Sequence, residues 1–253
     1  CSSDLNAFER CNILESIKFH ESSKLTFIGD YAFATCEKLK SIMIPKGITT
    51  IGEGAFSYCD KLQTVSFHKD INLKEIRNKT FKDCGLLNTK LPQSLEKIGK
   101  HAFSCDHSSS KITRITIPKN VKIIDDFAFH NADSIRSIIF ENNSKLEKIG
   151  DFAFSECYKL TDIIIPKSVR EIGEYCFVYD TELSSVTFEE GSLLTSIAGN
   201  AFNGCDKLNK PPKIPSSVLE LNCLTINSRI YYDENYNKLN ENNLPNISID
   251  DDD

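Results

Sequence analysis

The stretch that decides the fold runs from Ala32 to Gly52 and reads Ala-Phe-Ala-Thr-Cys-Glu-Lys-Leu-Lys-Ser-Ile-Met-Ile-Pro-Lys-Gly-Ile-Thr-Thr-Ile-Gly. The same order of residue types returns from Ala55 and again from Ala153. So regular a recurrence predicts one structural turn per repeat, with neighbouring turns burying one continuous core. The repeat Phe recurs every 22 to 26 residues, at Phe8, Phe33, Phe56, Phe81, Phe103, Phe129, Phe154, Phe177 and Phe202.

Each turn contains a short segment of alternating character. In the quoted stretch, Ile42 and Ile44 alternate with Ser41 and Met43, a pattern that predicts a strand with one buried face. Pro45 ends this strand because proline has no N–H to donate to a ladder. The return to the next Phe is short and irregular. We therefore expect it to consist of turns and short 3₁₀ or single-turn helical segments.

The cysteines follow the repeat. Six of the ten lie three residues after a repeat Phe, at Cys11, Cys36, Cys59, Cys84, Cys157 and Cys205. A recurring slot in an apolar frame predicts a column of buried thiols. Neighbouring turns would lie about 5 Å apart, which leaves a disulfide open by distance, although parallel side-chain directions disfavour one. The absence of a Cys-x-x-Cys pair argues against a zinc site.

Composition and motifs exclude several classes of function. The chain has 253 residues and a net charge of −6, which argues against a nucleic-acid-binding protein. No apolar run approaches the roughly 20 residues that span a bilayer. The sequence has neither a nucleophile elbow nor a Gly-rich phosphate loop, so we expect no catalytic residues, no cofactor and no metal. The start at Cys1 indicates an excised or processed fragment.

The motif Ala-Phe-x-x-Cys-x-x-Leu-x-x-Ile-x-Ile-Pro-x-x-Ile-x-x-Ile-Gly, as at Ala32 to Gly52, resembles the BspA-type leucine-rich repeat. The resemblance extends from about Ala7 to Leu221. It implies a right-handed α/β-type superhelical solenoid of about nine repeats, one per repeat Phe, with a parallel β-sheet on its concave face and turns and short 3₁₀ segments on its convex face. We assign residues 1–221 to the solenoid. We assign residues 222–253 to a capping strand, within Cys223 to Tyr232, and an acidic, disordered tail.

Proteins of this repeat type are often secreted or exposed at the cell surface, and several adhere to host matrix or to other cells. The resemblance therefore implies a non-enzymatic, adhesion-type interaction module at the cell surface or outside the cell, which binds a protein or glycan on its concave face. Two alternatives remain open. One is an intracellular scaffold, favoured by the many unpaired thiols. The other is the repeat segment of a larger receptor.

The outward positions of the strands supply the candidate binding face. Ile139 is expected beside Ile164, flanked by Arg114 and Asp162, and exposed apolar residues rimmed by charge can mark a binding spot. The same residues are also explained by strand propensity at solvent-facing positions. The candidate set is Arg114, Thr116, Ser137, Ile139, Asp162, Ile164, Ser185 and Thr187.

Three sequons for N-glycosylation begin at Asn78, Asn142 and Asn246. Chance alone predicts about three in a chain with this many Asn, Ser and Thr residues, so the sequons are no evidence of secretion. Asn142 falls in a predicted loop and is the best acceptor. Thr80 takes the place of a repeat Ala, so we expect Asn78 to be inaccessible after folding.

Overall fold

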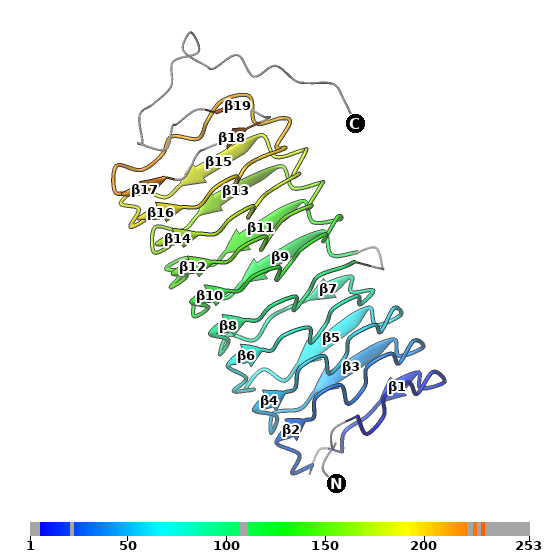
Figure 1. The fold of residues 1–253 in the computed structure, drawn as a ribbon. Helices are drawn as coiled ribbons and strands as arrows, with labels where there is room; N and C mark the ends of the chain where they lie inside the picture. Colours follow the sequence, from blue (N-terminus) through cyan, green and yellow to red (C-terminus); the bar gives the residue numbers. More distant parts are fainter. Residues whose placement is uncertain (1–5, 21–22, 107–110, 222–224, 227–228, 231–253) are drawn as a thin grey trace, which may run out of the picture.

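The computed structural model describes residues 6–20, 23–106, 111–221, 225–226 and 229–230. This part of the chain winds into about eight stacked turns built from parallel strands (Figure 1). One continuous core of Ile, Leu, Val, Phe, Ala and Cys side chains runs through the turns, from Ile28 to Leu221. The predicted leucine-rich-repeat solenoid is confirmed.

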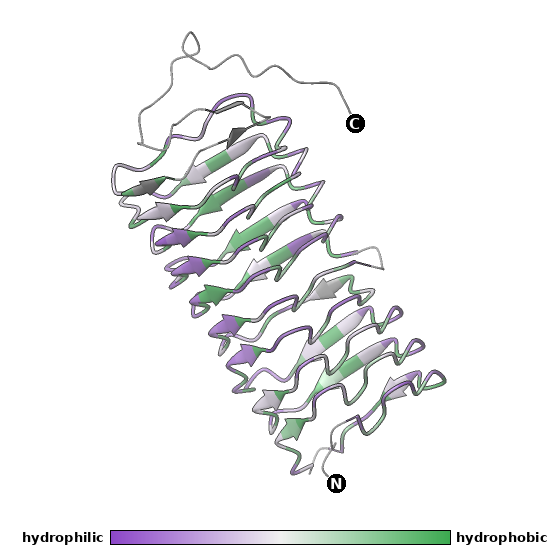
Figure 2. Cartoon of the chain, viewed as in Figure 1, coloured by the Kyte–Doolittle hydropathy of each residue, from purple (hydrophilic) through white to green (hydrophobic). Residues whose placement is uncertain are grey.

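The longer strands form one side of the solenoid, which we call the long-strand sheet. In β3, Ile42 and Ile44 are buried while Ser41 and Met43 are exposed, as the alternation predicts. Figure 2 shows this alternation of hydrophobic and hydrophilic residues along the long strands. The sheet has two halves of four parallel strands, β1 (Ser16–Ile17), β3 (Ser41–Ile44), β5 (Thr64–Phe67) and β7 (Asn88–Thr89), then β9 (Arg114–Ile117), β11 (Ser137–Phe140), β13 (Asp162–Ile165) and β15 (Ser185–Phe188).

A second set of parallel strands, each two residues long, lies in the segments where we expected turns and 3₁₀ helix. The expected turns are present in every repeat, but the expected 3₁₀ or single-turn helix was wrong, because the described residues contain no helix of any kind. Each short strand ends in a buried Ile or Leu, which anchors the segment in the core, and its backbone pairs with a neighbouring turn. We call this set the short-strand ladder. It has two parts: β2 (Phe27–Ile28) with β4 (Thr50–Ile51), and then β6 (Glu75–Ile76), β8 (Lys97–Ile98), β10 (Ile123–Ile124), β12 (Lys148–Ile149), β14 (Glu171–Ile172), β16 (Ser196–Ile197) and β17 (Glu220–Leu221).

In several turns a glycine directly follows the short strand. This happens wherever the preceding turn has Asp or Asn at the second position after its own short strand, as Asp126 precedes Gly150. A Cβ at Gly150 would lie 2.6 Å from both the backbone N and Oδ1 of Asp126. Asp126 Oδ1 accepts a hydrogen bond from the N–H of Asp151 at 3.1 Å, which ties the two turns together. Close approach rather than a left-handed backbone therefore selects these glycines, because none of the four has positive φ: Gly52, Gly99, Gly150 and Gly173.

The repeat Phe residues form a single stack along the inside of the solenoid. Ring centroids of successive members lie 5.1 to 5.6 Å apart from Phe8 to Phe202, with interplanar angles between 1° and 22°. Each ring between the two ends packs against one ring above and one below. No single turn can make these contacts alone, so the stack binds the turns into one cooperative body.

A further set of hydrogen bonds joins neighbouring turns around each repeat Phe, a segment that we call the Phe corner. Phe127 and Asn131, two residues before and after Phe129, have φ of +57° and +54°. The N–H groups of all three residues donate to carbonyls of the following turn, as Phe129 does to Ala153 O at 2.8 Å. A left-handed backbone costs roughly 1–2 kcal/mol at a non-glycine residue. These inter-turn hydrogen bonds offset that cost at each corner.

Near the C-terminal end, β18 (Thr225–Ile226) and β19 (Arg229–Ile230) pair antiparallel, unlike the other described strand pairs. They fall within the segment predicted to cap the solenoid. The remainder of that segment and the predicted disordered tail, from residue 231 onward, lie outside the described residues. The division at residue 221 therefore stays a prediction.

Candidate functional site

The candidate binding residues stand in two columns on the second half of the long-strand sheet. Strand registers align Arg114 with Ser137, Ser137 with Asp162, and Asp162 with Ser185. Thr116 pairs with Ile139, and Ile164 pairs with Thr187. Ser137 is half-buried and the other seven side chains are exposed. The fold therefore gathers the whole predicted set on one surface.

Two isoleucines form an apolar patch within these columns. Ile139 is 38% exposed and Ile164 is 56% exposed. Because Ser137 pairs with Asp162, the two isoleucines lie at equivalent positions on neighbouring strands. Asp162 flanks the patch and accepts a hydrogen bond from the Thr161 hydroxyl at 2.7 Å.

The long-strand sheet is interrupted beside this patch, between β7 and β9. Strand β7 pairs with β5 and strand β9 pairs with β11, but β7 and β9 do not pair with each other. In the sequence, the repeat is one residue short between Cys84 and Pro92, on the β7 side of this interruption. A cavity of about 340 Å³ opens at the break, lined by Thr89, Lys90, Leu91, Gln93, Arg114, Thr116, Pro118 and Glu141. We call it the sheet-break pocket.

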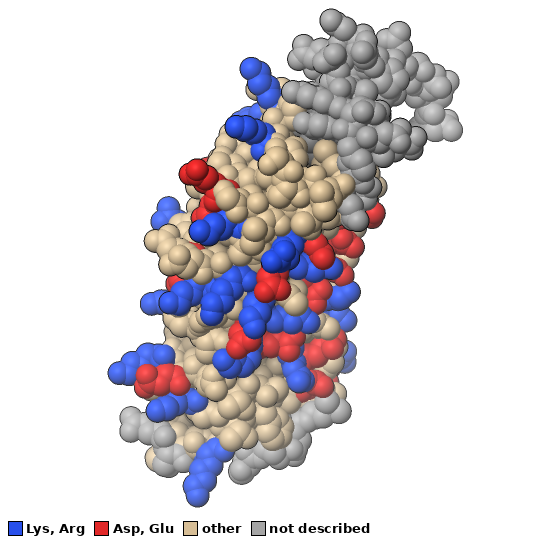
Figure 3. Space-filling view, turned by 90° about the vertical axis from the view of Figure 1, so that its left-hand side faces the viewer, with Lys and Arg blue, Asp and Glu red and all other residues tan. Residues whose placement is uncertain are grey.

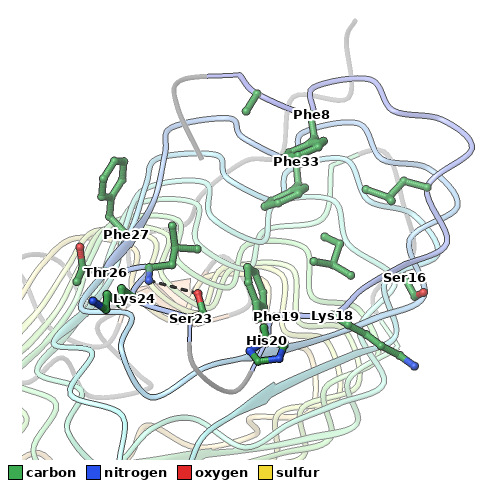
Figure 4. Close-up of a pocket in the computed structure, with 14 residues that line it drawn as sticks. Phe8, Ser16, Lys18, Phe19, His20, Ser23, Lys24, Thr26, Phe27 and Phe33 are labelled. Atoms are coloured by element: carbon green, nitrogen blue, oxygen red, sulfur yellow. Dashed lines mark hydrogen bonds between the residues drawn. The ribbon is translucent and has the colours of Figure 1, made fainter. Parts of the chain in front are cut away.

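A larger cavity, of about 850 Å³, lies at the N-terminal end of the solenoid (Figure 4). Core side chains of the first turn line it, including Leu14, Ile17 and Phe19. Phe8 is 45% exposed and stacks on Phe33 with ring centroids 5.1 Å apart. This cavity is the open end of the hydrophobic core rather than a site shaped by polar groups.

The cysteine column is confirmed as buried thiols. Seven free cysteines are buried and Cys11 is partly buried, while Cys1 and Cys223 lie outside the described residues. The thiol of Cys59 donates to the carbonyl of Phe33, in the preceding turn, at 3.1 Å. The same bond recurs one turn apart at Cys36, Cys84, Cys157 and Cys205. Burial raises the pKa of the Cys36 thiol to about 12. Such thiols stay protonated and are neither nucleophiles nor metal ligands at neutral pH.

One slot of the cysteine column holds a buried carboxyl group, which the sequence analysis did not identify. Asp180 lies three residues after Phe177 and is fully buried. Its Oδ1 accepts the N–H of Cys157 at 2.8 Å, whereas Oδ2 has no hydrogen-bond partner among the described residues. Desolvation raises the pKa of Asp180 well above its ordinary value, which favours the neutral acid.

Charges of both signs are interleaved on the side of the short-strand ladder, which faces the viewer in Figure 3. Glu96 accepts hydrogen bonds from Lys74 at 2.9 Å and from Lys122 at 3.4 Å. The ammonium nitrogen of Lys97 lies 3.1 Å from Oδ2 of Asp125. Exposed ion pairs of this kind contribute little stability. They leave this side solvated and largely charge-balanced.

Among the sequons, Asn142 is exposed. Asn78 is half-buried and its Oδ1 accepts the N–H of Lys100 at 3.0 Å, while Thr80 is wholly buried, as expected. Asn246 lies outside the described residues. Across the described ranges, no three His, Cys, Asp or Glu side chains are grouped as a metal site would require. No helix in that part of the chain has the length and apolarity to cross a membrane.

A family model described as "BspA type Leucine rich repeat region" matches residues 4–108 and 105–237. Several solved structures are similar to the chain. A leucine-rich repeat protein from Bacteroides ovatus is 26% identical over 80% of this chain and 73% of that one, with a TM-score of 0.34. A leucine-rich repeat protein from T. pallidum is 22% identical over 76% and 77%, with a TM-score of 0.49. A leucine-rich cell surface protein from Faecalibacterium prausnitzii is 21% identical over 85% and 78%, with a TM-score of 0.36. No curated protein sequence matches.

Proposed function

This chain belongs to the BspA-type leucine-rich repeat family, and from that premise we propose that it is a non-enzymatic module that binds a protein partner on its long-strand sheet. The observation that carries the proposal is the patch of Ile139 and Ile164, two exposed isoleucines on neighbouring strands whose other candidate residues are polar or charged. Covering exposed apolar surface stabilises a complex by roughly 25 cal/mol per Å² before the costs of association. The flanking Arg114 and Asp162 supply charge of both signs for specificity.

The long-strand sheet suits a partner better than the short-strand ladder does. On the ladder side, charges of neighbouring turns already pair with one another, as in Lys148 with Glu171 at 3.4 Å. A partner there would have to displace those contacts or leave them at its rim. Apart from Arg114 and Asp162, the candidate columns of the long-strand sheet instead present small polar and apolar side chains, which a partner covers at low cost.

We propose further that the protein acts at the cell surface or outside the cell, as an adhesion-type module. The family resemblance supports this location. The main argument for the intracellular alternative was the number of unpaired thiols. That argument loses force because seven of those thiols are buried, and burial raises the pKa of Cys84, Cys157 and Cys176, so that these thiols resist oxidation in any compartment.

Binding is tested by screening the chain against immobilised extracellular-matrix proteins and a glycan array, then measuring affinity for the strongest ligand. Replacing Ile139→Asp together with Ile164→Asp should weaken binding at least tenfold and leave the circular dichroism spectrum unchanged. The matched control is Tyr158→Asp with Leu193→Asp, which charges two exposed side chains outside the long-strand sheet. Equal affinity of the Ile139/Ile164 variant and wild type would refute the proposed face. A glycan as the strongest ligand would refute a protein partner.

Location is tested separately on intact source cells with a membrane-impermeant amine label. Labelled chain on unbroken cells supports a surface role. Labelling that requires lysis, in parallel with a cytosolic control, would contradict it and favour the intracellular scaffold.

A further inference from the structure

We propose that the sheet-break pocket between β7 and β9 receives a carboxylate side chain of the partner protein. This inference rests on the proposed function, because the pocket shares Arg114 and Thr116 with the candidate binding face. It adds the chemistry that the partner must present, which the apolar patch alone does not specify.

The charge of the pocket fits a single anion. Lys90 and Arg114 are both exposed, and neither has an acidic partner within ion-pair distance in the described chain. Glu141 is the one acid in the lining. Its two oxygens are already engaged, one by Gln93 Nε2 at 2.7 Å and the other by the N–H of Lys119 at 3.0 Å. Two cations less one carboxylate leave one net positive charge, which matches a carboxylate better than a dense polyanion.

The pocket also offers hydrogen-bond donors. Among the described strands, none pairs with the edge of β9 that faces β7, so the backbone there lacks the ladder bonds made elsewhere in the sheet. The hydroxyls of Thr89 and Thr116 lie in the same lining. Arg114 can bind a carboxylate with two parallel N–H···O bonds, a geometry that Lys cannot provide. Cation, hydroxyls and an open strand edge together form a receptor for a carboxylate.

Strand geometry places this receptor at a fixed distance from the apolar patch. Arg114 is paired with Ser137, and Ile139 is two residues further along β11. With strands about 4.8 Å apart and a rise of about 3.3 Å per residue, the backbone positions of Arg114 and Ile139 lie about 8 Å apart. Residues i and i+2 of an extended strand are separated by a similar length and face the same side. The partner is therefore expected to present an acidic and an apolar side chain in that spacing.

The test is an NMR titration of the full chain with the peptide acetyl-Thr-Leu-Thr-Glu-Thr-amide, in which Leu and Glu share one face. We expect amide shifts at β7 and β9, with at least tenfold weaker binding of the peptide that carries Gln in place of Glu. The variant Lys90→Glu with Arg114→Glu should lose affinity for the Glu peptide. It should gain affinity for a third peptide, which carries Lys in place of Glu. A merely structural role would not produce that reversal. Lys159→Glu with Arg170→Glu, two exposed cations outside the pocket, is the matched control and should bind as wild type does.

Each other result overturns the inference. Shifts at β11 and β13 without shifts at β7 and β9 would refute the carboxylate pocket and leave the proposed binding face standing. Shifts at β7 and β9 that are equal for the Glu and Gln peptides would show that charge is not recognised. A sulfated disaccharide that binds the pocket more tightly than the Glu peptide would assign it to an anionic glycan instead.

Discussion

Replacing Phe129 by alanine removes one ring from the middle of the Phe stack. Phe129 is fully buried, and its ring lies between those of Phe103 and Phe154, with centroids 5.1 and 5.3 Å away. Truncation of a buried Phe to Ala costs about 3–5 kcal/mol, which is a large fraction of the 5–15 kcal/mol that keeps a typical domain folded. The matched variant is Phe8→Ala, at the open end, where the ring is 45% exposed and has a single stacking neighbour.

Because about half of the Phe8 surface is already in water, Phe8→Ala should cost only about 1–1.5 kcal/mol. Urea denaturation of both variants and wild type, followed by circular dichroism at 25 °C, gives the two free-energy losses from the transition midpoints and slopes. The stack is refuted as a source of stability if Phe129→Ala unfolds at the wild-type midpoint. It is also refuted if Phe8→Ala loses as much stability as Phe129→Ala, because position in the stack would then have no effect.

Three further predictions concern single sites. Gly150→Ala should lower stability by about 1–3 kcal/mol, since its Cβ would overlap the backbone of Asp126, whereas a wild-type melting temperature would contradict that close approach. Asp180→Asn should raise the denaturation midpoint at pH 7. The folded-state pKa of Asp180 is raised, so its contribution to stability is fully present below the ordinary value of 3.8 and is lost as pH rises through the folded-state pKa. That gain should vanish near pH 4, and a difference that does not change with pH would refute a buried neutral carboxyl. On secretion from a glycosylating host, Asn142→Gln should remove a glycan detectable by mass, while Asn78→Gln should not, because Thr80 is buried.

Much of the fold follows from residues that recur at one spacing. The Phe stack, the buried Cys column and the four-residue strands such as β3 could be predicted because each repeats one residue type in one slot. The register of the binding columns follows from the same spacing, so Arg114, Ser137 and Asp162 could be aligned before the structure.

Other features leave little signal in the sequence. The short strands contain two residues each, too few for alternation to show, so Ile51 and Gly52 look like turn residues. The left-handed positions beside the repeat Phe are occupied by residues as different as Phe127, Lys79 and Tyr175, because inter-turn hydrogen bonds rather than residue type impose that backbone. The sheet-break pocket is lined by residues from 89 to 141, which come together only once the turns are stacked.

The measurement that tests the central claim most directly is site-specific photo-crosslinking. Benzoylphenylalanine is placed at Ile164, on the long-strand sheet, and in a second protein at Arg170, an exposed residue immediately before the short strand β14. Each protein is incubated with the partner identified by the matrix-protein screen, irradiated, and analysed by mass spectrometry. The account predicts a partner cross-link from position 164 and none from position 170. A cross-link from position 170 with none from position 164 would show that the partner binds the other side of the solenoid.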